Sequence, residues 1–239
     1  MMVRIQRISQ IMRLTRVPVP HTNEATYALD PGGRRWVAKR EADMGCEALL
    51  AEALTWLLAR EIGAPVPDAA FCDDPDERSW LSEWIPHAKH WSASSAGPIR
   101  NLEGAASILA LDAVVFNEAR HGGNLLLVPD VDGGSTAVAI DADEALIGHP
   151  AELTRRGLVP PDPRILAAGF PPGDWRAIAS DVATRVAALP DAWLDAAATE
   201  ACAVAREPHV HLVRDVLASR CRAAVELTGR YMDAVEARR

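Results

Sequence analysis

The run of apolar residues between positions 46 and 62 constrains the fold of this chain most strongly. Apolar side chains recur there at intervals of three and four residues, which places them on one face of an α-helix. The apolar positions are Cys46, Leu49, Leu50, Ala53, Leu54, Leu57, Leu58 and Ile62. Gly63 is suited to cap the end of this helix, and Pro65 and Pro67 prevent its continuation. The chain must therefore return to extended structure after a helix that buries one face.

Short runs of strand-forming residues lie on both sides of this helix. Residues 26–39 contain two such runs around an Asp-Pro-Gly-Gly turn at residues 30–33, which predicts a β-hairpin that ends at Lys39. Residues 80–85 predict a further strand, which ends before Pro86. The first third of the chain is therefore predicted to contain strands, one helix and more strands.

A second part of the chain begins where this pattern stops. Residues 87–98 are rich in Ser, Ala, His and Gly without clear periodicity, which predicts a linker. We therefore predict a two-lobed α+β fold, with an N-lobe at residues 1–86 and a C-lobe at residues 87–239. Within the C-lobe we expect a helix at residues 102–116, a β-hairpin at residues 124–141, and almost only helices in the last third of the chain.

Composition argues against several classes of protein. A chain of 239 residues with 49% hydrophobic residues can bury a core without disulfides or metals. Its net charge of −8 disfavours non-specific binding to nucleic acid or to anionic membranes. Arginines interrupt the apolar residues of positions 1–19, so we expect neither a signal peptide nor a membrane span, and we expect a cytoplasmic protein. The spacing of Cys202, His209, His211 and Cys221 matches no compact zinc module.

Lysine is rare in this sequence, and one lysine stands out. Of the 25 Lys and Arg residues, only Lys39 and Lys89 are lysines, so Lys39 at the end of an apolar strand is expected to have a specific role. A compact ammonium can bind phosphate oxygens as a point charge. Glu52 lies within the apolar helix face, where an unpaired carboxylate would be costly to bury, so a pair with Lys39 is expected. The alternatives are a surface lysine and an exposed glutamate.

The most concentrated polar signal is the segment Asn-Glu-Ala-Arg-His-Gly-Gly-Asn at residues 117–124. It precedes the first strand of the expected hairpin, and Asp141 ends the second strand. If these strands pair, Asn124 and Asp141 lie at the same end of the hairpin. Amide and carboxylate oxygens are ligands that Mg²⁺ prefers where it also holds nucleotide phosphates. The alternative is an ordinary polar hairpin base.

In this order of elements the chain resembles the HipA-like serine/threonine kinases. The matching elements are a strand lysine, a helix glutamate followed by Leu-Ala-Arg-Glu-Ile-Gly-Ala-Pro-Val-Pro, a short hinge-like strand, a loop similar to N-x-D-R-H-x-x-N, and a strand that ends in Ile-Asp. The resemblance extends from Tyr27 to the C-terminal helices. It implies a two-lobed kinase fold, ATP and Mg²⁺ as cofactors, and transfer of the γ-phosphoryl group to a Ser or Thr hydroxyl of a protein. It also implies an antitoxin or another regulatory protein as a partner.

The resemblance also implies a role for each matching residue. Lys39 would bind the nucleotide phosphates, and Glu52 would orient Lys39. Asn124 and Asp141 would coordinate Mg²⁺. The adenine-facing hinge would consist of Glu83, Trp84 and Ile85, and the structural residues of the loop would be Arg120 and His121.

The sequence departs from the family pattern in two places. Ala119 occupies the position of the catalytic aspartate, and the metal-binding motif, usually Ile-Asp-His-Gly, reads Ile-Asp-Ala-Asp at residues 140–143, which ends in Asp143. Alanine cannot orient an attacking hydroxyl or accept its proton, so the rate should fall by about 10²- to 10⁴-fold. The chain could carry an introduced substitution, be a natural pseudokinase, or use a displaced base such as Glu118 or Asp143. We favour the first explanation, because a single change restores the pattern.

Two other functions remain open at this point. A catalytically silent module could use a nucleotide-filled cleft to present a surface to a partner, and Ala119 supports that alternative. A small-molecule phosphotransferase could act on a cationic metabolite or antibiotic. Acidic residues that face the cleft from the C-terminal helices would favour the small-molecule enzyme, whereas an open rim would favour a protein substrate.

Overall fold

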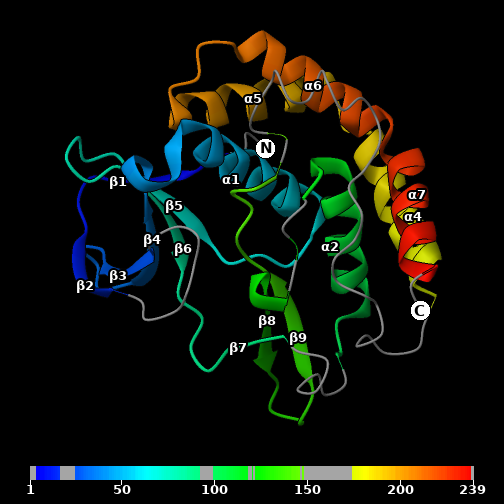
Figure 1. Cartoon of the computed structure of the whole chain (residues 1–239), viewed down its shortest axis with the longest axis horizontal. Helices are drawn as coiled ribbons and strands as arrows, with labels where there is room; N and C mark the ends of the chain where they lie inside the picture. Colours follow the sequence, from blue (N-terminus) through cyan, green and yellow to red (C-terminus); the bar gives the residue numbers. More distant parts are fainter. Residues whose placement is uncertain are drawn as a thin grey trace.

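The protein is described by a computed structural model that covers residues 4–16, 25–91, 99–117, 120, 122–145, 147 and 174–237. A curled β-sheet forms the N-terminal side of the molecule, a small second sheet lies below it, and helices form the rest (Figure 1). This mixed α+β arrangement is the predicted fold class.

The larger sheet has six strands in the order β1-β5-β6-β4-β3-β2. The strands are β1 (Gln6–Ile8), β2 (Met12–Arg16), β3 (Ala25–Leu29), β4 (Arg35–Arg40), β5 (Ala69–Cys72) and β6 (Ser79–Glu83). β1 pairs with β5 in parallel, and all other neighbours are antiparallel. The predicted first hairpin is β3–β4, and its turn is held by the carboxylate of Asp30, which accepts hydrogen bonds from the backbone N–H of Arg34 and the indole of Trp36.

Helix α1 (Glu41–Ile62) buries the predicted apolar residues from Leu49 on, but Cys46 is exposed and the helix begins earlier than predicted. Gly45 has a backbone φ of 84°, a conformation that favours glycine, and it kinks the helix between a short first turn and the predicted segment. Gly63 caps the helix in the left-handed conformation, as expected. Leu49, Leu57 and their neighbours on this face are fully buried, so α1 is a core helix.

The smaller sheet corrects the prediction of a linker at residues 87–98. Its strands are β7 (Lys89–His90), β8 (Leu125–Pro129) and β9 (Ser135–Ala139), in that order. Lys89 lies opposite Leu127 and His90 opposite Leu126, and the N–H of Trp91 donates to the carbonyl of Leu125. The start of the predicted linker is therefore an edge strand, while residues 92–98 lie outside the described residues.

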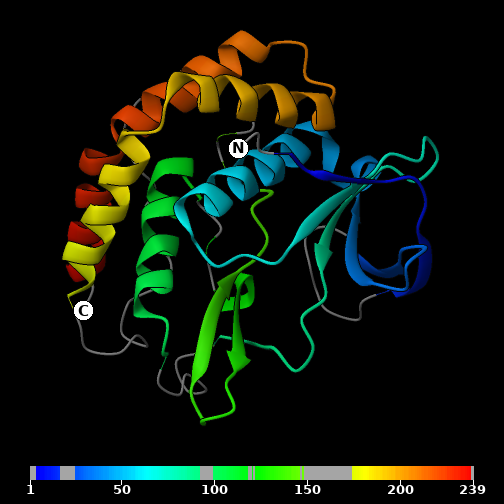
Figure 2. The same ribbon diagram turned by 180° about the vertical axis from the view of Figure 1, so that it is seen from behind.

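Further helices pack against α1 and against one another. They are α2 (Leu102–Val115), α4 (Trp175–Ala187), α5 (Asp191–Ala205), α6 (Val210–Arg222) and α7 (Ala224–Glu236). Helices α5 and α6 lie over α1, and α4 and α7 lie beside α2 (Figures 1 and 2). The largest hydrophobic cluster joins side chains of α1, α2, α4, α5 and α6. Among the helices that the structure describes, none is long and apolar enough to cross a bilayer.

A buried arginine adds a polar link between the sheet and α5. Arg78, just before β6, forms ion pairs with Glu41 at the start of α1 and with Asp73 at 2.7 Å. Its guanidinium also donates to the carbonyl of Val204 in α5 at 2.7 Å and lies over the ring of Phe71. Apolar packing and this link together fix α1 between the sheet and the C-terminal helices.

Candidate functional site

Three carboxylates surround the ammonium of Lys39 on β4. The Nζ atom of Lys39 lies 2.8 Å from Glu52 Oε1 on α1 and 3.3 Å from Asp143 Oδ2, and it hydrogen-bonds to Asp141 Oδ1. Burial opposes the charged form, but these carboxylates outweigh burial and raise the pKa of Lys39. The lysine therefore stays charged. The predicted pair between Lys39 and the buried Glu52 is present, and it is part of a larger cluster than the sequence suggested.

The hairpin β8–β9 brings Asn124 and Asp141 to one end, as the spacing predicted. Leu125 pairs with Ala139, and the N–H of Ile140 donates to the carbonyl of Asn124 at 3.1 Å. Asp141 follows the strand with a backbone φ of 61°, which residues other than glycine adopt at an energetic cost. From this position its carboxylate reaches Lys39, on a distant strand of the other sheet.

A buried ion pair holds the loop that precedes Asn124. Arg120 contacts the fully buried carboxylate of Asp112 on α2, with Nε 3.0 Å from Oδ2. It also donates to the carbonyls of Asn124 and Ile140 at 2.5 and 2.6 Å. One guanidinium thus joins α2 to both strands of the hairpin at the end where Asp141 lies. The sequence analysis identified Arg120 and missed Asp112, although an aspartate inside the apolar run of α2 was a usable signal.

Three residues of the loop that were singled out from the sequence lie outside the described residues. They are Glu118, Ala119 and His121. Their neighbours on both sides are described: Asn117 donates to Asp112 at 3.3 Å, and Arg120 pairs with the same carboxylate. The two ends of the short segment are therefore fixed to α2.

A cavity of about 190 Å³ opens beside the lysine cluster. Lys39 and Asp141 line it. So do Glu83, which ends β6, and the two residues that follow it, Trp84 and Ile85. Apolar side chains of Tyr27 and Val37 from the larger sheet, and of Leu126 from the smaller one, line it as well. A cavity with apolar walls and a charged group suits a ligand with a flat ring and an anionic tail.

Comparison with known proteins identifies the fold. No protein-family model matches the sequence, and no curated protein sequence does. Among solved structures, the proinflammatory kinase CtkA of Helicobacter pylori matches with a TM-score of 0.60, over 98% of this chain and 99% of CtkA, at 8% identity. HipA of Shewanella oneidensis MR-1, solved with HipB and operator DNA, matches with a TM-score of 0.51, over 92% of this chain and 67% of HipA, at 13% identity. The chain has a protein-kinase-like fold.

In this kinase-like fold the residues at positions 83–85 connect the two sheets. The N–H of Glu83 donates to the carbonyl of Asp68 at 2.8 Å, and the N–H of Trp84 donates to the carbonyl of Arg35 at 3.1 Å. Within the part of the chain that the structure describes, the N–H of Ile85 has no such acceptor. The strand β6 ends at Glu83, earlier than predicted, so Trp84 and Ile85 belong to the connection and line the cavity.

The side chains of the same connection are fixed by arginines. The carboxylate of Glu83 lies 2.7 Å from Arg34, which also pairs with Asp68 at 2.8 Å. The ring of Trp84 contacts Tyr27 edge-on and lies under the guanidinium of Arg35. Arg34 is a residue that the sequence analysis did not single out. The side chains of Glu83 and Trp84 therefore hold this connection in place. The backbone N–H of Ile85 is the hydrogen-bond donor that this stretch can offer to a ligand.

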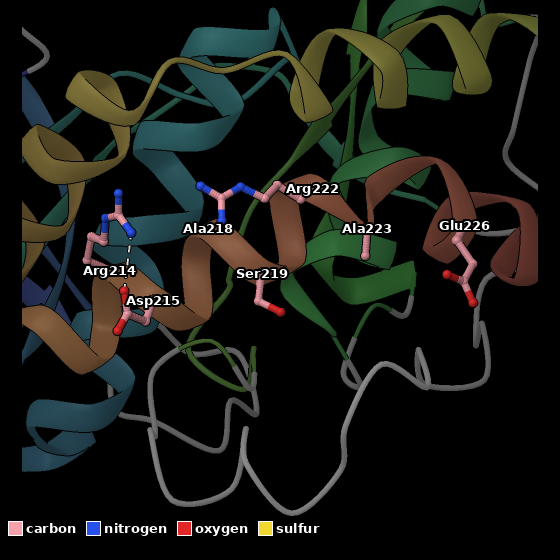
Figure 3. Close-up of a pocket in the computed structure, with 7 residues that line it drawn as sticks. All are labelled: Arg214, Asp215, Ala218, Ser219, Arg222, Ala223 and Glu226. Carbon is pink, nitrogen blue, oxygen red and sulfur yellow. Dashed lines mark hydrogen bonds and ion pairs between the residues drawn. The ribbon is translucent and has the colours of Figure 1, made fainter.

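A second hollow lies on the outer side of the kinase-like fold, along α6 and α7 (Figure 3). It has a volume of about 550 Å³, but its charged side chains pair with one another or with neighbours. Arg214 contacts Asp195 at 2.9 Å and Asp215 at 3.2 Å. None of the residues predicted to carry chemistry lines this surface. The site beside Lys39 is therefore the better candidate.

The cysteines of the helical part are buried and protonated. Burial raises the pKa of Cys202 and of Cys221 to about 12. Over the described ranges, no three His, Cys, Asp or Glu side chains form a group suited to hold a metal.

The carboxyl group of Asp143 has a raised pKa, in a range where its effect on stability can be measured. Burial, together with the charges of Asp141 and Glu52, raises the pKa of Asp143 to about 6. Burial acts on Asp141 in the same direction, but the charge of Lys39 and a hydrogen bond from Asp143 outweigh it and lower the pKa of Asp141 to about 2. The two carboxyl groups thus share one proton between about pH 2 and pH 6, and both are largely ionised above that range.

We expect Asp143→Asn to stabilise the protein at alkaline pH. The raised pKa means that the stability contributed by protonated Asp143 is full below 3.8 and is lost as pH rises through about 6. An amide never ionises, so the variant should have a free energy of unfolding about 1 to 3 kcal/mol higher at about pH 8, with little gain at about pH 4. Urea unfolding at both pH values measures this. Asp132→Asn, in an exposed turn, is the control, and an equal gain at both pH values would contradict the prediction.

Proposed function

We propose that this chain is an ATP- and Mg²⁺-dependent phosphotransferase of the kinase type, with an N-lobe at residues 1–86 and a C-lobe at residues 87–239. The observation that carries the proposal is the ion pair between Lys39 and Glu52, which lies beside Asp141 at the cavity. These groups come from a strand, a helix and a hairpin that are distant in the sequence. A lysine held by a buried glutamate at the end of an apolar cavity is suited to bind the phosphates of a nucleotide.

The proposed orientation of the nucleotide follows from the two kinds of lining. The adenine ring lies between apolar side chains such as Val37 and Leu126, and its edge accepts a hydrogen bond from the N–H of Ile85. Glu83 and Trp84 complete the hinge. The phosphates extend to Lys39, whose ammonium neutralises part of their charge.

The residues near Asp141 fit a divalent cation. Three carboxylates share one ammonium, so the cluster has an excess of negative charge that a cation would offset. Asn124 and Asp141 offer hard oxygens, and Mg²⁺ in nucleotide sites needs only one or two carboxylates because phosphates and waters complete its shell. Asn124 and Asp141 would hold Mg²⁺, and the ion would supply charge neutralisation of the phosphates.

The proposed reaction transfers the γ-phosphoryl group of ATP to a Ser or Thr hydroxyl of a protein. The residues of this chain contribute by positioning: Lys39 holds the phosphates, Glu52 holds Lys39, and Arg120 fixes the loop. Ala119 leaves the acceptor hydroxyl without a carboxylate, so we propose that the chain binds nucleotide and turns it over slowly. A regulatory protein partner is part of the proposal, since the HipA structure contains HipB.

A natural pseudokinase that binds nucleotide and a partner is the second candidate, and Ala119 supports it. A small-molecule phosphotransferase is less supported. Among the described residues, the acidic groups that line the cavity are Glu52, Glu83 and Asp141, and none of them belongs to α4, α5, α6 or α7. The acidic surface that a cationic substrate needs is therefore not formed by those helices.

Nucleotide binding by Lys39 tests the proposal. We expect the protein to bind ATP with Mg²⁺, and we expect Lys39→Met to weaken that binding by at least about tenfold, because a charge-assisted contact to phosphate is lost. Isothermal titration calorimetry measures the affinity, and circular dichroism checks that the variant is folded. Lys89→Met, at the other lysine of the chain, is the matched control. Equal ATP affinity in the Lys39 and Lys89 variants would exclude the proposed site.

A further inference from the structure

His90 lies on the edge strand β7 at the mouth of the proposed nucleotide cavity. Its side chain is exposed to solvent and lines the cavity together with Leu126, which is opposite it in the sheet. Its Nδ1 atom lies 2.7 Å from the carbonyl oxygen of Gly123. Gly123 directly precedes Asn124, so the imidazole is hydrogen-bonded to the loop that bears a proposed cation ligand.

This hydrogen bond determines which nitrogen of the ring carries hydrogen. A carbonyl oxygen can only accept, so Nδ1 must be the donor. In the neutral imidazole, Nε2 then has a lone pair and accepts hydrogen bonds. A neutral His90 in this orientation can bind a hydroxyl group, which donates, and cannot bind a phosphate oxygen in the same way.

The surrounding backbone keeps His90 in this place. A Cβ atom at Gly122 would lie 2.5 Å from the carbonyl oxygen of Trp91, so the loop and β7 are in closer contact than any other residue type at position 122 would permit. The N–H of Trp91 also donates to the carbonyl of Leu125. The imidazole is thus held on the short strand β7, which pairs with β8 and packs against the loop at Gly122 and Gly123.

The position of His90 in the cavity indicates what it meets. It follows the hinge residue Ile85 closely in the sequence, and it contacts the loop that leads to Asn124. Its side chain lines the same cavity as Ile85, proposed for the base, and Lys39, proposed for the phosphates. The ribose is the part of a nucleotide that joins these two, and its hydroxyls are hydrogen-bond donors.

We propose that His90 accepts a hydrogen bond from a ribose hydroxyl through Nε2 and makes the site selective for nucleotides that carry this hydroxyl. The inference rests on the proposed function, because it assumes that a nucleotide occupies the cavity. Losing one such hydrogen bond should weaken binding by about five- to tenfold. The protein should therefore bind ATP about five- to tenfold more tightly than 2′-deoxy-ATP or 3′-deoxy-ATP, whichever lacks the hydroxyl that His90 holds.

Two variants separate this role from a purely structural one. In His90→Asn, the side-chain amide can still donate to the carbonyl of Gly123, but no acceptor remains at the position of Nε2. This variant should bind ATP about five- to tenfold more weakly and should no longer distinguish ATP from the deoxy analogue. In His90→Gln, the amide oxygen can reach the position of Nε2, so part of the preference should return.

The experiment measures by calorimetry the affinities of ATP, 2′-deoxy-ATP and 3′-deoxy-ATP, each with Mg²⁺, for the unsubstituted protein and for the two variants. Lys89→Met, one residue away on the exposed edge strand, should keep the full preference. Equal binding of all three nucleotides by the unsubstituted protein, or an unchanged preference in His90→Asn, would overturn the role of His90 while leaving the nucleotide site in place. Failure of the unsubstituted protein to bind ATP would instead overturn the proposed function and this inference with it.

Discussion

We expect Ala119→Asp to raise the rate of phosphoryl transfer from ATP by about 10²- to 10⁴-fold, the contribution that a positioned general base makes. The variant adds the carboxylate that the family resemblance places at this position, while Lys39, Glu52 and Asp141 are already together at the cavity. Asn117 and Arg120, on either side of the substituted segment, are both hydrogen-bonded to Asp112. The new side chain would therefore be attached to a loop whose ends are fixed.

Labelled ATP with Mg²⁺ and a cell extract gives the measurement, because it reports both the rate and the identity of the labelled acceptor. Ala119→Asn has nearly the same shape as the aspartate variant but no basic group, so it should gain little. Combining Ala119→Asp with Lys39→Met should remove the gain. A rate that stays negligible in Ala119→Asp would favour a pseudokinase that binds nucleotide without catalysis.

The second large effect should come from the buried pair of Asp112 and Arg120. Removing the carboxylate in Asp112→Ala leaves a guanidinium that is almost fully buried without its counter-charge, and this should lower the free energy of unfolding by about 3 to 5 kcal/mol. Arg120 also holds the carbonyls of Asn124 and Ile140, so residual folded protein should bind ATP and Mg²⁺ more weakly. Urea unfolding and calorimetry measure the two consequences.

A double variant and a surface pair provide the controls. Asp112→Leu combined with Arg120→Met removes both charges and should recover part of the loss in stability, because no unpaired ion remains. Arg176 pairs with Asp233 on the surface, where both side chains are about half exposed or more, and Arg176→Ala should change the stability little because solvent screens the pair. A loss below about 1 kcal/mol in Asp112→Ala would show that the buried pair contributes no more than a surface pair.

The sequence predicted those parts of the fold whose physical cause is local. The apolar period of residues 46–62 gave a buried helix, and the glycine-rich turn gave the hairpin that brings Asn124 and Asp141 together. The kink at Gly45 was missed, because a glycine near a helix start does not indicate by itself whether the first turn is continuous. β7 was missed because two residues have no periodicity, and their strand conformation depends on the edge of β8.

The site shows the same division between local and long-range causes. The pairing of Lys39 with Glu52 could be predicted, since a buried carboxylate needs a partner and the chain has few lysines. The positions of Asp143 and His90 could not, because each depends on contacts between elements far apart in sequence. In the sequence, Asp143 stood out only as a departure from the family's metal-binding motif. Its ion pair with Lys39 is visible only in the folded structure.

The burial of α1 beneath α5 limits how this protein can be controlled. Glu52 is carried by a helix whose apolar face shares one core with the C-terminal helices, and Arg78 ties the start of that helix to Val204. Swinging the helix outward to separate Glu52 from Lys39 would expose that core to water, which is costly. An effector that turns the protein on or off would therefore act more easily at the cavity beside Lys39 and its loop than by moving this helix.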